Sequence, residues 1–191
     1  MFLQQLVKTG KTVFSSEDLG KIFEIDNKNY LKVVLSRLTK RGELIRLRKG
    51  IFIIREDYNR YELANKLKRP SYVSLERILF ENDIIFQDYS NAITSVSNNS
   101  YKEQIAGFDY SYYKIKDEIL TNPIGIEIKN NYAVATTERA SCDLIYLMKN
   151  FYFDNIDHIN KDLLKEISKI YNKRVIREVE KICSTQKNME K

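Results

Sequence analysis

Basic residues gather in one stretch of this sequence, residues 28–50, which reads KNYLKVVLSRLTKRGELIRLRKG. The stretch contains eight Lys and Arg residues and a single acidic residue, Glu43, whereas the other 168 residues carry 24 basic and 25 acidic side chains. The formal charge of +6 therefore belongs to one segment of a nearly neutral chain. Because Lys and Arg neutralise phosphates, charge concentrated in this way predicts a nucleic-acid-binding surface.

Ten residues of this stretch are candidate DNA contacts. We expect Lys32, Ser36 and Arg37 to contact bases, because their hydroxyl and cationic groups suit the edges of base pairs. The other cations are expected on phosphates, where they contribute affinity without reading sequence. The candidate DNA-binding residues are Lys28, Asn29, Lys32, Ser36, Arg37, Lys40, Arg41, Arg46, Arg48 and Lys49.

Two elements must position these side chains, a helix and a hairpin. A helix is predicted from about residue 28 to Gly42, because an apolar stripe recurs at helical spacing through Leu31, Val34, Leu35 and Leu38. The next run, ELIRLRKGIFII, alternates apolar and basic residues and turns at Lys49-Gly50. It predicts a two-stranded hairpin with basic residues at its tip.

Two further helices are predicted before this pair, over residues 2–9 and 16–23. Three short helices followed by a hairpin are typical of a winged helix-turn-helix, in which the third helix enters the major groove. We therefore expect a winged helix-turn-helix DNA-binding domain over residues 1–56.

Residues 57–191 differ in character from the basic part. Helices are predicted over residues 57–67 and about 73–81, then from Thr137, and finally in the runs DLLKEISKIY and RVIREVEKICS. Between them lie four runs rich in β-branched and aromatic residues, AITSVS, QIAGFDYSYYKI, IGIEIK and YAVAT, which predict four strands in a mainly antiparallel sheet. The expected fold class is α+β, with a C-terminal sheet-and-helix domain.

A metal-dependent nuclease is the alternative that the second domain raises. Glu127 and Lys129 form an E-x-K pair on a predicted strand, where a carboxylate could hold a metal and a lysine could lie beside the attacked phosphate. The pattern is weak, since alternating charges on an exposed strand produce it by chance. The further acidic ligand would have to be Asp109 or Asp117. We expect no enzymatic activity.

The remaining reactive residues favour structural roles. His158 is the single histidine, and a catalytic pair with Cys142 would require the two to lie side by side. We expect Cys142 and Cys183 to be reduced residues in or near the core. Tyr110, Tyr112 and Tyr113 either belong to a strand that buries alternate rings or stack on unpaired bases, and we favour the strand. No cofactor, metal or membrane segment is expected, and the protein is predicted to be cytoplasmic.

Four segments resemble the AbiEi-type antitoxins of type IV toxin-antitoxin systems: LTKRGELIRLRKGIFII, ANKLKRPSYVSLERIL, ITSVS and ATTERASCDLIYL. The resemblance extends from about Leu31 to Leu147. It implies an antitoxin that represses its own operon, with double-stranded promoter DNA as its ligand. It also implies that the C-terminal domain opposes a nucleotidyltransferase-like toxin, with which it need not form a stable complex. A stand-alone winged regulator, whose second domain senses or dimerises, stays open as an alternative.

Overall fold

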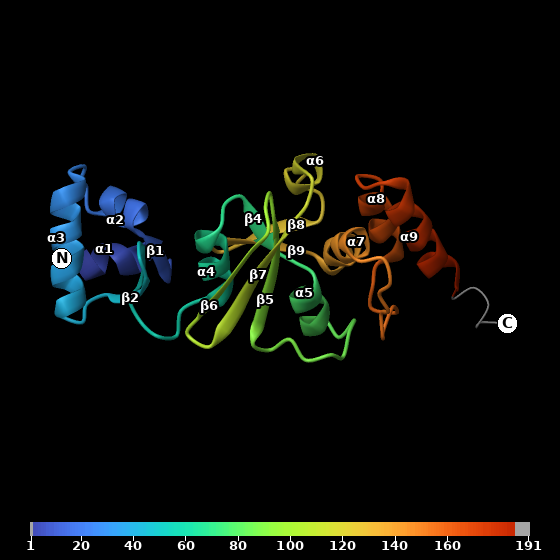
Figure 1. Cartoon of the computed structure of the whole chain (residues 1–191), viewed down its shortest axis with the longest axis horizontal. Helices are drawn as coiled ribbons and strands as arrows, with labels where there is room; N and C mark the ends of the chain where they lie inside the picture. Colours follow the sequence, from blue (N-terminus) through green and yellow to red (C-terminus); the bar gives the residue numbers. More distant parts are fainter. Residues whose placement is uncertain (1, 186–191) are drawn as a thin grey trace.

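The computed structural model describes residues 2–185 and shows an elongated molecule. A unit of short helices and a small sheet lies at one end, a larger sheet lies in the middle, and a group of helices lies at the other end (Figure 1). The fold class is α+β, as the sequence predicts, with a winged helix-turn-helix followed by a sheet-and-helix part.

The first six elements form the winged unit, which we define as α1 through β3. Its elements are α1 (Phe2–Lys8), β1 (Val13–Ser15), α2 (Ser16–Ile22), α3 (Lys28–Lys40), β2 (Ile45–Arg48) and β3 (Ile51–Ile53). The strands form the small sheet, in the order β1-β3-β2 with both pairings antiparallel. The three predicted helices and the hairpin are confirmed. β1 was not predicted, because three residues are too few to show an alternating pattern.

Side-chain caps fix where the helices of the winged unit begin. Ser15 caps α2 in a capping box, in which its hydroxyl accepts from the Asp18 amide at 3.0 Å and the Asp18 carboxylate accepts from the Ser15 amide at 2.8 Å. Asn27 caps α3 by accepting from the amides of Asn29 and Tyr30, both at 3.0 Å. The predicted stripe of α3, Leu31, Val34, Leu35 and Leu38, is buried in a core shared with Leu19 and Phe52.

The second part is built on the large sheet, whose strand order in the described chain is β6-β7-β5-β4-β9-β8. Its strands are β4 (Ser71–Val73), β5 (Ala92–Ser97), β6 (Tyr101–Ile105), β7 (Phe108–Lys114), β8 (Ile126–Lys129) and β9 (Tyr132–Ala135). The sheet is mixed, since β5 pairs with β7 and β4 with β9 in parallel, while the remaining neighbours are antiparallel.

Three of the five pairings in the described sheet are antiparallel, as predicted, but the predicted number of four strands is wrong for two reasons. The run QIAGFDYSYYKI is divided between β6 and β7 by a turn at Ala106-Gly107, where both residues have positive φ angles of 49° and 79°. Ser71–Val73, expected to lead into a helix, instead joins the sheet as β4. The first error is a missed two-residue turn between strands that are adjacent in sequence. The second arises because β4 is short and pairs only with strands distant in sequence.

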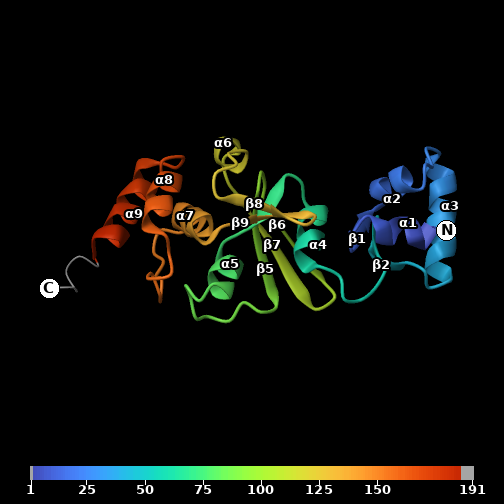
Figure 2. The same ribbon diagram turned by 180° about the vertical axis from the view of Figure 1, so that it is seen from behind.

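Helices cover both faces of the large sheet. The helices in order are α4 (Arg60–Leu67), α5 (Glu76–Glu81), α6 (Asp117–Leu120), α7 (Thr137–Leu147), α8 (Lys161–Ser168) and α9 (Lys173–Thr185). Tyr112 donates from one face to the carbonyl of Ala64 on α4 at 2.7 Å. Tyr72 donates from the other face to Asp143 on α7 at 3.0 Å. α4 packs on β4, β9 and β1, so it lies between the large sheet and the winged unit (Figure 2).

The winged unit and α4 share buried contacts. Val13, Ile51 and Ile53 of the small sheet are buried in the same apolar cluster as the large sheet and α4. Lys66 of α4 donates to Asp18 of α2 at 2.7 Å, and the Thr12 hydroxyl donates to Glu62 of α4 at 2.7 Å. These contacts fix the orientation of the winged unit on the second part.

Candidate nucleic-acid interface

The outward ridge of α3 is a line of exposed residues on the winged unit. Asn29, Val33, Ser36 and Lys40 follow one another at intervals of four, three and four residues, on the side of the helix opposite the buried stripe. All four are exposed. We call this line the α3 ridge, and it can enter a major groove without displacing the core.

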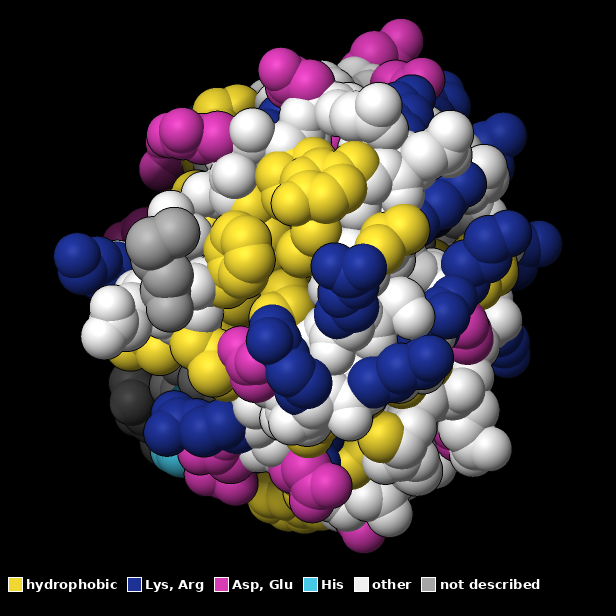
Figure 3. Space-filling view, turned by 90° about the vertical axis from the view of Figure 1, so that its left-hand side faces the viewer, with side chains coloured by type: hydrophobic (Ala, Val, Ile, Leu, Met, Phe, Trp, Pro, Cys, Tyr) yellow, Lys and Arg dark blue, Asp and Glu magenta, His cyan; other side chains and the backbone are white. Residues whose placement is uncertain are grey.

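Figure 3 looks onto the end of the molecule that α3 occupies. Lys and Arg side chains gather there beside a hydrophobic patch. Two large apolar residues of α3 contribute exposed surface, Tyr30 with 56% and Val33 with 45% of its area accessible. This mixture of charge, amide, hydroxyl and methyl groups matches the varied edges of base pairs more closely than a uniformly charged helix face would.

A cleft of about 470 Å³ separates α3 from the wing, the hairpin of β2 and β3. Lys32 and Lys40 reach it from α3, and Arg46 and Lys49 reach it from the wing. The four cations make no ion pair within residues 2–185, so their charges are available to an anionic ligand. Ser16 and Thr39 line the same cleft and add hydroxyl donors.

Nine of the ten predicted DNA-binding residues are exposed at this end of the molecule. They are Lys28, Asn29, Lys32, Ser36, Arg37, Lys40, Arg41, Arg46 and Lys49. Arg41 is held by its neighbour Glu43, with 2.8 Å between the Arg41 Nε and a carboxylate oxygen. The structure thus brings the predicted α3 and wing cations together, while their contacts with DNA stay a prediction.

Arg48 is placed differently from the other nine. It forms an ion pair with Glu103 of β6, on the second part of the chain, instead of facing the cleft. The cause is a bulge in β2, where Arg46 pairs with Phe52 but Arg48 pairs with Ile51, so that Leu47 is the additional residue. A bulge reverses the alternation of side chains along a strand, and Arg46 and Arg48 consequently point in different directions.

Helix α2, which precedes α3, is held in place by a charged contact. Burial of the Asp18 carboxylate would by itself raise its pKa, but hydrogen bonds from Lys66 and Ser15 lower the pKa to about 2. Asp18 therefore stays ionised and ties α2 to α4 at neutral pH. Since α2 packs beside α3 in one core, this contact also helps to orient the α3 ridge.

Residues 1–55 match a family model described as transcriptional regulator, AbiEi antitoxin. The matched segment contains the whole winged unit and all ten predicted DNA-binding residues. It confirms, over these residues, the resemblance to AbiEi-type antitoxins that the sequence shows. A search of curated proteins gave no match. Within the described residues, no helix is long and apolar enough to cross a membrane.

Beyond the AbiEi match, two of the four segments that carry the resemblance, ANKLKRPSYVSLERIL and ATTERASCDLIYL, meet in a buried polar network. Asp143 accepts hydrogen bonds from Tyr72 at 3.0 Å, from Ser74 at 2.8 Å and from Tyr171 at 2.6 Å. Arg139, whose side chain is completely buried, donates to Tyr72 and to main-chain carbonyls near α6. Each charge is surrounded by partners, so the network links β4, α7 and the helices after it as a structural element.

The geometry offers little support for a nuclease. Glu127 and Lys129 pair with each other at 2.9 Å on β8, an edge strand, and both side chains are about half exposed. Asp109 lies on β7, four strand spacings away, which is about 19 Å. Within residues 2–185, no cluster of three or more His, Cys, Asp or Glu side chains could hold a metal ion.

The other residues considered from the sequence are structural. Cys142 is buried, and burial raises the pKa of its thiol, whereas His158 is exposed. A buried thiol with a raised pKa is a poor nucleophile. Both cysteines are free, as predicted. Tyr110 and Tyr112 are buried and Tyr113 is partly buried, so the prediction of a strand that buries alternate rings is confirmed.

Two exposed α3 residues, Tyr30 and Val33, lie outside the ten candidate DNA contacts, although helical spacing already predicts that Val33 points outward. Charge and hydrogen-bonding groups guided the prediction, and an exposed Val or Tyr gives no such signal. The relevant signal is position, because Val33 lies on the helix face opposite the apolar stripe and yet is apolar itself. An exposed apolar residue at the centre of a cationic face indicates a contact surface.

Proposed function

We propose that this protein is a transcriptional repressor that binds double-stranded DNA of its own promoter and acts as an antitoxin. The observation that carries the proposal is the α3 ridge beside a cleft of unpaired cations, within the segment that matches the AbiEi regulator family. Residues 1–56 serve as the DNA-binding domain and residues 57–191 as the antitoxin domain. The protein acts in the cytoplasm, without membrane association.

In the proposed complex, the α3 ridge lies in the major groove. Asn29 and Ser36 hydrogen-bond to base edges, and the Val33 methyl groups contact thymine methyl groups. The exposed cations on both sides of the ridge contact the two phosphate backbones, with Arg37 on one side and Lys32, Arg46 and Lys49 on the other. The sequence alone leads us to expect Lys32 and Arg37 on bases. In the proposed complex they contact phosphates instead, because they lie beside the α3 ridge.

The antitoxin role is proposed for residues 57–191. It is supported by the segments that resemble AbiEi-type antitoxins, two of which, ANKLKRPSYVSLERIL and ATTERASCDLIYL, are joined through Arg139 and Asp143. The expected functional partner is a nucleotidyltransferase-like toxin of a type IV system, opposed without a stable complex. No metal or cofactor is part of this proposal, and the protein acts without catalysing a reaction.

Footprinting on the DNA upstream of the reading frame tests the repressor role. A protected site that disappears when Asn29, Val33 and Ser36 are changed together to Ala is the expected result. Uniform, sequence-independent protection would contradict a specific repressor. The neighbouring reading frame separates the remaining alternatives, because a nucleotidyltransferase encoded there supports the antitoxin, and growth rescue by co-expression would test it. A frame without such a protein favours the stand-alone regulator.

A further inference from the structure

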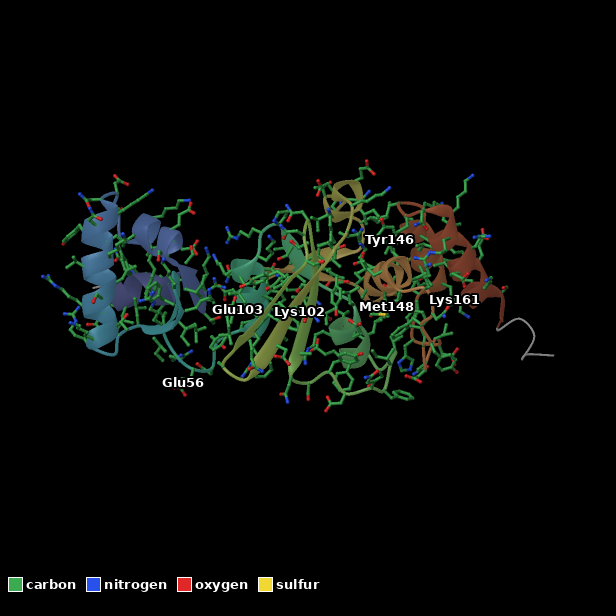
Figure 4. The ribbon with its side chains drawn as sticks, viewed as in Figure 1. Glu56, Lys102, Glu103, Tyr146, Met148 and Lys161 are labelled. Carbon is green, nitrogen blue, oxygen red and sulfur yellow. The ribbon has the colours of Figure 1, made fainter. Side chains whose placement is uncertain are left out.

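The wing and the second part of the chain are joined by an ion pair. Arg48, at the end of β2, pairs with Glu103 of β6, although the two residues are 55 positions apart. Tyr101 donates its hydroxyl to the same carboxylate at 2.5 Å and accepts from Arg48 Nη1 at 3.3 Å. Figure 4 shows Glu103 at the edge of the large sheet that faces the winged unit.

The contact is sheltered more than an ordinary surface pair. The Arg48 side chain is 35% exposed and the Glu103 side chain 23%. By contrast, Arg46 is exposed in the cleft beside α3 and Lys49 lies at the turn of the wing, and neither has an acidic partner in the described chain. The wing therefore presents two cations without an acidic partner in the described chain, Arg46 and Lys49, while its third cation, Arg48, is paired with Glu103.

The ion pair matters because a carboxylate and a phosphate compete for the same guanidinium group. Both bind the planar donors of Arg in similar geometry, so Arg48 cannot satisfy Glu103 and a DNA phosphate fully at once. Rotation of the wing towards DNA would not release Arg48, because the winged unit is fixed on α4 by the Lys66–Asp18 pair and by buried apolar residues.

We propose that Glu103 withholds Arg48 from the DNA backbone and so lowers the affinity of the protein for DNA. The inference rests on the proposed function, because it concerns how the wing contacts DNA. Through this contact, the β6 edge of the second part sets the number of phosphates that the wing neutralises. A ligand or partner that draws Glu103 away would strengthen DNA binding without touching the winged unit.

The salt dependence of DNA binding measures this effect directly. Each phosphate contact contributes about 0.9 to the slope of the logarithm of the binding constant against the logarithm of salt concentration. If Glu103→Gln releases Arg48, the slope becomes steeper by about 0.9. Between about 50 and 200 mM salt the variant then loses about 3.5-fold more affinity than the wild type does.

The experiment compares four full-length chains: wild type, Arg48→Ala, Glu103→Gln and the double variant. Each is titrated with a mixed-sequence duplex several helical turns long, over a range of salt concentrations. We expect Glu103→Gln to bind more tightly at low salt with a steeper slope, and the double variant to return to the wild-type slope. Arg48→Ala should change the slope much less in the wild-type background than in the Glu103→Gln background.

A matched control separates this mechanism from a general change of charge. Glu178 lies on α9, pairs with a lysine, and is far from α3, so Glu178→Gln changes the net charge equally and should leave DNA binding unchanged. Tyr101→Phe, which removes the hydroxyl that holds Glu103, provides a second variant with an intermediate effect. Thermal unfolding of each variant is used to check that the variant is folded.

Three outcomes would overturn the proposal. Equal slopes for wild type and Glu103→Gln would show that Arg48 is not withheld. An increase in affinity that persists in the double variant would show simple repulsion of DNA by Glu103. A wild-type chain that binds no duplex would overturn the proposed function itself, and this inference with it.

Discussion

In the proposed complex, single residues on α3 divide into those that contact bases and those that contact the phosphate backbone. Asn29, Val33 and Ser36 lie on the α3 ridge and carry no charge, whereas Lys32 and Arg37 lie on its two sides. Phosphate contacts strengthen binding to every sequence, and base contacts distinguish one sequence from another. Substitutions on the ridge and beside it should therefore have different signatures.

Asn29→Ala is expected to weaken binding to the protected promoter site by about 1–3 kcal/mol, because it removes an amide that hydrogen-bonds to a base edge in the proposed complex. Binding to a mixed-sequence duplex should stay unchanged. Arg37→Ala should instead weaken binding to both duplexes by a similar factor. Competition between the two duplexes measures this difference. Equal losses of affinity on both duplexes for Asn29→Ala would show that Asn29 reads no base.

The exposure of nine candidate residues could be predicted from the sequence, but the orientation of the tenth, Arg48, could not. Nine of the ten candidates follow from helical spacing and from the alternation of the hairpin, which are local properties. Arg48 does not, because the bulge at Leu47 reverses its side chain and its partner lies on β6. No local pattern in the sequence predicts the bulge or the ion pair with Glu103.

Elements of the winged unit are positioned by a few polar contacts in addition to their core. Asp18 closes the capping box of α2 and also accepts from Lys66 of α4. One carboxylate therefore stabilises the start of a helix and its attachment to the second part. Ionisation of Asp18 should therefore make the free energy of unfolding of the whole chain depend on pH.

The Asp18 contribution is expected to disappear in acid. The pKa of Asp18 is about 2 in the folded chain against an ordinary value of 3.8, so its stabilisation is complete above pH 3.8 and is lost as the pH falls towards 2. The loss should be on the order of 2 kcal/mol. Asp18→Asn should be less stable at neutral pH and lack this component.

Urea unfolding of both chains, followed by circular dichroism between neutral pH and about pH 2, gives the comparison. Glu17→Gln, which alters a neighbouring exposed carboxylate on the same helix, is the matched control. If wild type and Asp18→Asn lose stability in parallel through this range, Asp18 has no special role.

Element prediction succeeded where the pattern is long and local. The stripe of α3 repeats within a single helix, and the structure confirms it. The short strands β1 and β4 and the helix α6 were missed. Their conformations depend on partners far along the chain, so propensity within three or four residues carries too little information.

The whole molecule is held together by a core that crosses the proposed boundary between residues 56 and 57. Val13, Ile51 and Ile53 belong to the winged unit but are buried in the same cluster as α4 and the large sheet. The winged unit is therefore attached rigidly, as the proposed influence of Glu103 on the wing requires. A flexible tether would not transmit such an influence.

An isolated fragment of residues 1–56 should consequently be less stable than the same unit in the full chain. It would expose Val13, Ile51 and Ile53, and burial of each such side chain contributes about 1.5–3 kcal/mol. The expected result is unfolding at a clearly lower urea concentration than the full chain, measured by circular dichroism. An unchanged midpoint would show that the two units are energetically independent.

The central claim is that α3 and the wing bind DNA, and the salt dependence of duplex binding tests it most directly. Changing Lys32, Arg37 and Lys40 together to Ala should reduce the slope by about 0.9 for each phosphate that the variant no longer neutralises. The matched variant changes Lys165, Lys169 and Arg177 to Ala, which are three exposed cations near α8 and α9 at the opposite end of the molecule. We predict a weaker and less salt-dependent complex for the first variant and wild-type binding for the second. Equal binding by both variants would contradict the claim.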